Sequence, residues 1–306
     1  MDSGGKQLQM FGGLWTEKKL NVLAKYLCSY TTALKNQPFT KVYIDAFAGT
    51  GYRELKADDQ AILPLFAQIA EEAPQKFLDG SARIALRTKP SFDQYLFIEK
   101  SRARAEKLEK LRSEPDWTSL ADSVYVRCGE SNELLRRWCD DTDWKDCRAV
   151  VFLDPFGMQV DWNTVQTIAK TGAIDTWILF PLGMAVNRML ADDLADIPSP
   201  WQDRLTKVFG DDRWRGEFYH ETISDPLFGT GKTRMRKGCA LEQIGSAYHR
   251  RLQSIFPAVA RNPAILRNST RSPLFQFHFA AANAGEGGKI ALRIAEHLLK
   301  GITEDI

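Results

Sequence analysis

The sequence has few cysteines, and their spacing matches no disulfide framework or metal cradle. There are five in 306 residues, an odd number, and no two of them form a C-x-x-C pair. A disulfide-stapled fold, a zinc site and an iron-sulfur site are therefore not expected. The four histidines are also dispersed, without ligand spacing. We expect reduced thiols, as in a cytoplasmic protein, and no bound metal.

Long apolar runs and leader patterns are missing as well. The longest apolar run, residues 176–186, is about half of the ~20 residues needed to span a bilayer, and Pro181 and Gly183 interrupt it. Residues 1–13 carry a single lysine, with no apolar core and no small-residue cleavage pattern, so they do not resemble a secretory signal. These absences predict a cytoplasmic chain without a membrane span.

The chain has almost no net charge, with 41 Lys+Arg against 39 Asp+Glu, but its charges are unevenly distributed. Residues 204–271 hold thirteen Lys/Arg and six Asp/Glu, so the remainder of the chain is net negative. For polyanion binding the distribution of charge matters more than its sum. Four cations on one Gly-rich stretch are candidates for contacts with nucleic-acid phosphates: Lys232, Arg234, Arg236 and Lys237. A solvated basic loop is the open alternative.

The residues that are present are typical of a globular α/β protein, with 44% hydrophobic and 26% charged residues. Apolar residues spaced at three and four predict a helix over 20–34, and a β-branched and aromatic run predicts a strand over 41–47. Ser81 is placed to cap a further helix. Strands predicted over 94–98, 123–127, 148–153 and 175–180 then alternate with helices over 102–111, 132–139 and 162–169. This alternation predicts right-handed βαβ units and a parallel sheet.

The last third of the chain departs from this alternation. Helices are predicted over 187–194, 200–209 and 241–256, around a basic loop at 228–238. A hairpin over 264–267 and 274–281 and a helix over 289–299 then predict an antiparallel sheet edge with a covering helix. We divide the chain into an N-terminal helical segment (1–40), an α/β core (41–185), a helical basic insertion (186–262) and a closing hairpin and helix of the core (263–306).

The ends of the predicted strands carry an unusual set of residues. In an open parallel sheet, ligands bind beyond the carboxyl ends of the strands. The first strand ends in Asp45 and runs into Gly49 and Gly51, where the backbone can turn sharply against a ligand. The later ends carry Glu99, the pair Gly129-Glu130 and the run Asp154-Pro155-Phe156. Each motif alone is compatible with a turn or a helix cap, but their recurrence favours a ligand site.

The type of ligand follows from the first of these loops. A dinucleotide-binding loop needs G-x-G-x-x-G so that backbone N–H groups meet the pyrophosphate. The first glycine of that pattern is missing here, and Asp45 lies four residues before Gly49. A carboxylate at this place repels phosphate but suits a sulfonium or an amine. The pattern therefore predicts a neutral or cationic ligand that contains a nucleoside.

These residues resemble class I S-adenosylmethionine-dependent methyltransferases. The stretch DAFAGTG at 45–51 resembles their D-x-F-x-G-x-G motif, and Asp154-Pro155-Phe156 resembles the D-P-P-Y/F motif of amino-group methyltransferases. The resemblance implies a Rossmann-like sheet, mostly parallel with an antiparallel last strand, carrying an α-helical insertion. It also implies S-adenosyl-L-methionine as cofactor, held by Asp45, Phe47, Gly49, Gly51, by Glu99 at the ribose, and by Gly129 and Glu130 near the adenine.

A closer resemblance, to the three-Cys-motif partner protein family, covers most of the chain. It rests on residues 15–19, IDAFAGTG at 44–51, Gly80-Ser81, residues 97–99, GESN at 129–132 and LDPFG at 153–157. The cysteines in the family name belong to a radical S-adenosylmethionine partner protein, not to this chain. Membership implies a methyltransferase-like fold, and it adds Lys18 to the candidate cofactor-binding residues.

The D-P-P-Y resemblance implies a way of methylating an amino group. Asp154 would accept hydrogen bonds from the target amine beside Pro155, and Phe156 would stack on an extruded nucleic-acid base. Three alternatives stay open. The D-P-F-G run is a turn that shapes only the cofactor pocket; the acceptor is a protein or a small molecule; or the chain is a non-catalytic, cofactor-binding partner of the radical protein.

Overall fold

A central eight-stranded sheet organises the protein. The computed structural model describes residues 14–48, 80–155, 157–223, 233–268 and 270–304. The strands lie in the order β3-β2-β1-β4-β5-β10-β8, and β9 also pairs with β10. Their bounds are β1 Thr40–Asp45, β2 Gln94–Glu99, β3 Val124–Cys128, β4 Cys147–Leu153, β5 Ile174–Phe180, β8 Ala258–Val259, β9 Ala264–Arg267 and β10 Pro273–Ala281.

The direction of the strands confirms the predicted fold. Strands β1 to β5 pair in parallel, whereas β10 runs antiparallel to β5, β8 and β9. The chain therefore has a mixed, Rossmann-like α/β fold with a mostly parallel sheet and a reversed last strand, as the methyltransferase resemblance implied. The closing hairpin of β9 and β10 lies where the sequence predicted an antiparallel edge.

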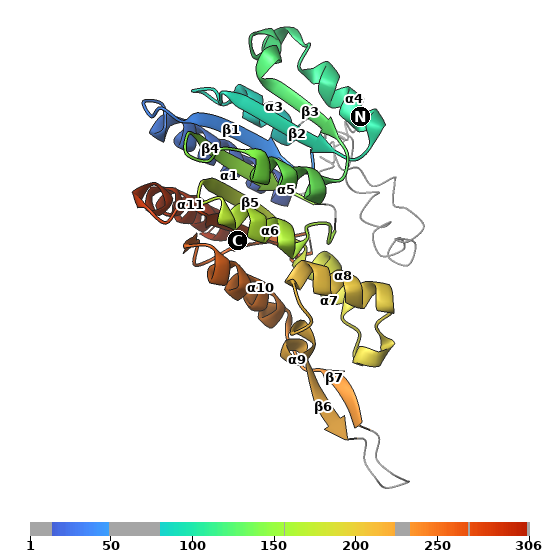
Figure 1. Ribbon diagram of the computed structural model, residues 1–306. Coiled ribbons are helices and arrows are strands. Elements are labelled where there is room, and N and C mark those ends of the chain that lie inside the picture. Colours follow the sequence, from blue (N-terminus) through green and yellow to red (C-terminus); the bar gives the residue numbers. More distant parts are fainter. Residues whose placement is uncertain (1–13, 49–79, 156, 224–232, 269, 305–306) are drawn as a thin grey trace, which may run out of the picture.

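Helices cover both faces of this sheet (Figure 1). One apolar cluster holds residues of α1 (Leu14–Ala33), α3 (Gly80–Arg87), α4 (Arg102–Leu111) and α11 (Glu286–Glu304). The other holds residues of α5 (Ser131–Asp141), α6 (Trp162–Lys170), α8 (Ser199–Phe209) and α10 (Leu241–Ile255). Within β1, Val42 and Ile44 belong to the second cluster and Tyr43 to the first. This alternation is the period-two pattern of a strand buried on both faces.

The described chain also has several short elements and a separate two-stranded hairpin. The short elements are η3 (Pro115–Ser123), η4 (Leu182–Val186), α7 (Asn187–Met189), η5 (Leu194–Asp196) and α9 (Trp214–Phe218). Strands β6 (Tyr219–Ile223) and β7 (Thr233–Lys237) form a two-stranded antiparallel hairpin. In Figure 1 this hairpin projects away from the sheet and its helices. The predicted division of the chain into four segments stays a prediction, although α8 and α10 share an apolar cluster with the sheet.

Two secondary-structure predictions in this region were wrong. The helix expected over 187–194 ends at Met189, and the loop expected over 228–238 contains strand β7. The carbonyl of Asp192 accepts a hydrogen bond of 2.8 Å from the N–H of Lys237. The carboxylate of Asp193 caps η5 by accepting from the N–H of Ala195 at 3.1 Å. Pairing with β7 and this local cap override the helical pattern. Within the described ranges, no helix is both long and apolar enough to cross a bilayer.

Candidate functional site

The carboxyl ends of three neighbouring strands bring three acidic side chains to one edge of the sheet. Asp45 ends β1, Glu99 ends β2 and Asp154 directly follows β4. Because β1 lies between β2 and β4, these ends are adjacent. Asp45 and Glu99 are 1% and 0% exposed, and the side chain of Asp154 is 27% exposed. The sequence-predicted acids therefore do gather at the edge where a parallel sheet binds its ligands.

Asp45 is buried and accepts two hydrogen bonds from the described residues. The hydroxyl of Ser81, at the start of α3, donates to Asp45 Oδ2 at 2.6 Å, and the N–H of Phe47 donates to Oδ1 at 3.3 Å. Burial raises the pKa of Asp45 to about 7, against the lowering effect of the Ser81 hydrogen bond. The nearby charges of Asp154 and Lys19 act on it in opposite directions. Near neutral pH this carboxyl is thus poised between its two protonation states.

Glu99 has one satisfied and one unsatisfied oxygen. Its Oε1 accepts from the backbone N–H of Ser101 at 2.6 Å and from the guanidinium of Arg104 at 2.8 Å. Its Oε2 is buried and has no hydrogen-bond partner among the described residues. Burial raises the pKa of Glu99, although the hydrogen bond from Arg104 lowers it. A buried acceptor without a donor costs free energy, so this oxygen is suited to a ligand hydroxyl.

Asp154 pairs with a lysine that is not among the predicted site residues. Lys19, on α1, donates from Nζ to Asp154 Oδ2, and its side chain is only 3% exposed. The ammonium lies 5.3 Å from the ring centroid of Trp15 and 5.7 Å from that of Phe152. Asp154 Oδ1 has no hydrogen-bond partner among the described residues. The site is therefore a cluster of two carboxyls and one ammonium, Asp45, Asp154 and Lys19, with Glu99 on the adjacent strand.

The turn after β3 connects this edge to the chain beyond β4. The N–H of Gly129 donates to the carbonyl of Glu99 at 3.0 Å. Glu130 caps α5, because its Oε2 accepts from the N–H of Glu133 at 2.9 Å and its Oε1 from the amide of Asn132 at 2.9 Å. The same Asn132 amide donates to the carbonyl of Gln159 at 2.8 Å. The capping role is visible in the structure, and contact of Gly129 and Glu130 with an adenine stays a prediction.

Some of the other candidate cofactor-binding and catalytic residues lie within the described ranges and some do not. Phe47 and Pro155 are buried, with Phe47 in the apolar cluster of the α5 and α6 face. Lys18 is half-buried and one position away from the lysine that contacts Asp154. Four of the candidates lie outside the described residues: Gly49, Gly51, Phe156 and Lys232. For all of them, contact with a ligand stays a prediction.

The candidate nucleic-acid residues of the β6–β7 hairpin differ from one another. Lys237 points its ammonium into the protein, where Nζ donates to Asn187 Oδ1 at 2.9 Å and to the carbonyl of Leu190 at 3.3 Å. Arg234 is half-exposed and lies 3.8 Å from Asp193. Arg236 is half-buried and faces the same side of the hairpin as Arg234, two positions away. Of these three, Lys237 is occupied in anchoring the hairpin.

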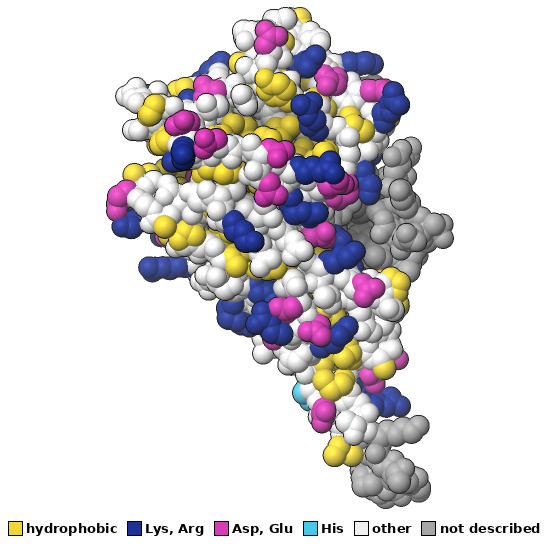
Figure 2. All heavy atoms as spheres, in the orientation of Figure 1, with side chains coloured by type: hydrophobic (Ala, Val, Ile, Leu, Met, Phe, Trp, Pro, Cys, Tyr) yellow, Lys and Arg dark blue, Asp and Glu magenta, His cyan; other side chains and the backbone are white. Residues whose placement is uncertain are grey.

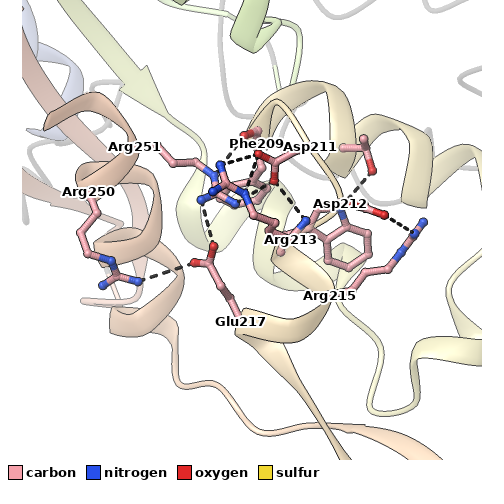
Figure 3. Close-up of polar contacts among 10 residues, drawn as sticks. Phe209, Asp211, Asp212, Arg213, Arg215, Glu217, Arg250 and Arg251 are labelled. Carbon is pink, nitrogen blue, oxygen red and sulfur yellow. Dashed lines mark hydrogen bonds and ion pairs between the residues drawn. The ribbon is translucent and has the colours of Figure 1, made fainter. Parts of the chain in front are cut away.

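Most other cations of residues 204–271 are paired with acids. Figure 3 shows Arg251 of α10 against Asp211 and Glu217, with Nε 3.0 Å from the carbonyl of Phe209 and Nη1 2.9 Å from Glu217. Arg213 pairs with Asp211 at 2.6 Å. Figure 2 shows basic and acidic side chains interspersed over this face. The excess of positive charge in the sequence does not form a patch of a single sign on this face.

The comparisons with known proteins concern the fold. No protein-family model matches the chain, and no curated protein matches it. Among solved structures, it is similar to a spermidine synthase in complex with the transition-state analogue AdoDATO, at 11% identity and a TM-score of 0.39. It is also similar to spermidine synthase from Thermotoga maritima, at 11% identity and a TM-score of 0.38. Each match covers 89% of this chain and 61% of the other, so the chain spans about three fifths of those enzymes.

A methyltransferase from Geobacter sulfurreducens is also similar, at 13% identity and a TM-score of 0.29, with 70% of this chain and 78% of that chain covered. These neighbours share a broad architecture with the protein at low identity. The chemistry of this protein therefore has to be inferred from its own side chains.

Proposed function

We propose that this protein is an S-adenosylmethionine-dependent methyltransferase whose cofactor binds at the carboxyl ends of β1, β2 and β4. The observation that carries the proposal is the buried Oε2 of Glu99, which no donor of the described residues reaches. An unsatisfied buried acceptor costs about 1–3 kcal/mol, more when it is charged, and a ligand that supplies a donor recovers that free energy. A ribose has two neighbouring hydroxyls, and in nucleotide-binding sheets an acid at this position accepts from them.

The charges of the site support a cationic cofactor over a phosphate. When Asp45, Asp154 and Lys19 are all ionised, this cluster has a net single negative charge. S-adenosylmethionine carries a net single positive charge and supplies an electrophilic methyl group on its sulfonium. A pyrophosphate would instead face the buried carboxylates of Asp45 and Glu99 without the N–H groups of a G-x-G-x-x-G loop.

The side chains around the site would act mainly by positioning. Methyl transfer is an in-line displacement, so the protein gains most from fixing the acceptor against the donor. Asp154 Oδ1 is available to accept a hydrogen bond from an acceptor N–H. We further propose that the acceptor is an amino group of a nucleic-acid base. The resemblance of Asp154-Pro155-Phe156 to D-P-P-Y and the half-exposed Arg234 support this choice.

Isothermal titration calorimetry with S-adenosylmethionine and S-adenosylhomocysteine tests cofactor binding. We expect the wild type to bind both ligands and Glu99→Ala to bind at least about ten-fold more weakly, because a charged acceptor of the ribose is lost. Glu106→Gln is a matched control, since Glu106 on neighbouring α4 is exposed and pairs only with Arg102 in the described part of the chain. Absence of binding by the wild type would refute the proposal.

Transfer of a radiolabelled methyl group to RNA, DNA and protein tests the reaction. We expect the wild type to label a nucleic acid and Asp154→Asn to lose most of that activity while it still binds S-adenosylhomocysteine. Binding without transfer to any of the three would instead support the non-catalytic partner role that the three-Cys-motif resemblance implies. Labelling of protein alone would refute the nucleic-acid acceptor.

A further inference from the structure

The position of Lys19 changes what Asp154 can bind. The lysine side chain is buried on α1, with its ammonium near the rings of Trp15 and Phe152 and in contact with Asp154 Oδ2. Asp45 responds electrostatically to both Lys19 and Asp154, so the three charges lie within reach of one another. The described residues show no second anion on the Lys19 ammonium. The negative charge of Asp154 is therefore compensated by Lys19 before a methyl acceptor binds.

This pairing has different consequences for neutral and for charged acceptors. A neutral N–H group needs only a hydrogen-bond acceptor, and Asp154 Oδ1 provides one. A protonated aliphatic amine at Asp154 needs a negative counter-charge there, and Lys19 cancels the charge of Asp154. The remaining negative charge of the cluster is that of Asp45, which we assign to the cationic cofactor. At contact distance an opposite or like charge shifts a neighbouring ionisation by about one to three pKa units, equivalent to about ten- to thousand-fold in binding. Because Asp154 is 27% exposed, the lower end of that range applies.

We propose that Lys19 is a specificity-determining residue: it favours the binding of neutral N–H groups at Asp154, such as amides and the exocyclic amines of bases, and disfavours the binding of aliphatic amines, which are protonated near neutral pH. The inference rests on the proposed function, because it takes Asp154 as the group that meets the acceptor. Lys19 acts through Asp154 and is a positioning residue. Its replacement by an uncharged side chain would leave Asp154 as an uncompensated carboxylate and so create a site for a cation.

Sinefungin is a suitable probe, because this analogue carries a protonated amine in place of the donated methyl group. S-adenosylhomocysteine has no group there and serves as the reference for cofactor binding. The measured quantity is the ratio of the two dissociation constants from calorimetry. In Lys19→Met, we expect the affinity for sinefungin, divided by that for S-adenosylhomocysteine, to be about ten-fold higher than in the wild type. In Lys19→Arg, which keeps the charge, the ratio should stay near the wild-type value.

Two further variants separate this role from a merely structural one. Asp154→Asn leaves the Lys19 ammonium uncompensated, so sinefungin should lose affinity relative to S-adenosylhomocysteine. The double variant Lys19→Met/Asp154→Asn removes both charges and should return the ratio toward the wild-type value. A general loss of packing would weaken both ligands alike and would not produce this reversal. Circular dichroism melts of each variant show whether it is folded.

The outcomes of this experiment are distinct. Failure of every variant and the wild type to bind S-adenosylhomocysteine would overturn the proposed function itself, and the inference with it. Normal binding of S-adenosylhomocysteine with an unchanged ratio in Lys19→Met and Lys19→Arg would overturn only the role of Lys19. If Lys19→Met does not fold, the ratio in Asp154→Asn still decides: a ratio equal to the wild type contradicts the inference.

Discussion

Two charged regions of the molecule differ in how completely their charged groups are supplied with hydrogen-bond and ion-pair partners. At the carboxyl ends of β1 and β2, Asp45 and Glu99 are almost completely buried, and Glu99 keeps one oxygen without a partner in the described structure. Around α8 to α10, Arg251 pairs with both Asp211 and Glu217, and Arg213 pairs with Asp211. A buried acceptor atom that lacks a donor favours a ligand, whereas fully paired charges favour the fold. We therefore place the proposed function at the strand ends with the unsatisfied acceptor, and not in the region richest in charge.

The largest expected effect is a loss of stability when the ion-pair network around Arg251 is broken. The side chain of Arg251 is 10% exposed and bonds Glu217, Asp211 and the carbonyl of Phe209. Arg251→Ala should lower the free energy of unfolding by about 2–4 kcal/mol, because it leaves partly buried acceptors without a donor. Urea denaturation measures this change. Arg213→Ala, in the same network but exposed, should stay within experimental error, and equal losses in both variants would contradict a structural role specific to Arg251.

The second effect concerns the buried acid of the strand-end site. The pKa of Asp45 is about 7 in the folded protein, above the ordinary value of 3.8 for an aspartate. Between these values the folded state binds one more proton than the unfolded state, so stability falls as pH rises through this window. Relative to Asp45→Asn, the wild type should lose about 2–3 kcal/mol of unfolding free energy between pH 5 and pH 8.

Denaturation of both proteins at several pH values measures that difference. The subtraction removes the contribution of His278, whose pKa is lowered by burial and which occurs in both proteins. The variant should also bind S-adenosylmethionine much more weakly, since it lacks the carboxylate. A stability difference independent of pH would show that Asp45 ionises normally and that the contrast between the two regions is wrong.

A smaller effect is expected at Ser81, which tunes the pKa of Asp45. Its hydroxyl donates to Asp45 at 2.6 Å and lowers the pKa of that carboxyl. Affinity for the cationic cofactor should rise with pH as Asp45 ionises, with a midpoint near 7 in the wild type. Ser81→Ala should move this midpoint upward by about one pH unit, as expected for the loss of one charge-assisted hydrogen bond. Ser254→Ala, an exposed serine of α10, is the control, and an unmoved midpoint would exclude the role of Ser81.

The smallest effect concerns the β6–β7 hairpin. Arg234 and Arg236 share one face of the hairpin, whereas Lys237 is held by Asn187 and Leu190. If the hairpin contacts a nucleic-acid backbone, Arg234→Ala/Arg236→Ala should reduce the slope of log affinity against log salt by about one to two. Lys237→Ala should instead lower stability and leave the slope nearly unchanged. Fluorescence anisotropy with single-stranded RNA across salt concentrations measures both, and identical slopes throughout would remove the hairpin from the proposal.

The sheet could be predicted from the sequence because its strands are covered on both faces. Strand β4 and strand β5 are buried along nearly their whole length, so apolar runs marked them within a residue or two. The acids at the strand ends followed from the same boundaries. Helix α4 was predicted with its exact bounds, from Arg102 to Leu111.

What could not be predicted depends on contacts between distant segments. Lys19 lies in the buried stripe of α1 with Val22, Leu23 and Tyr26, but the apolar pattern predicted a helix only from Leu20 onward, and the family resemblance pointed to Lys18. Continuing the stripe backward by four residues from Leu23 would have identified Lys19 as a charged residue on an apolar face. The pairing of basic residues with local acids around α8 to α10 requires the folded arrangement, because sequence counts carry no distances.

A crystal structure with S-adenosylhomocysteine tests the central claim most directly. We expect the nucleoside to lie beyond the carboxyl ends of β1 and β2, with Glu99 Oε2 accepting a hydrogen bond from a ribose hydroxyl. The contradicting result is a structure in which the ligand binds elsewhere, or binds at this edge while Glu99 Oε2 bonds another group of the protein.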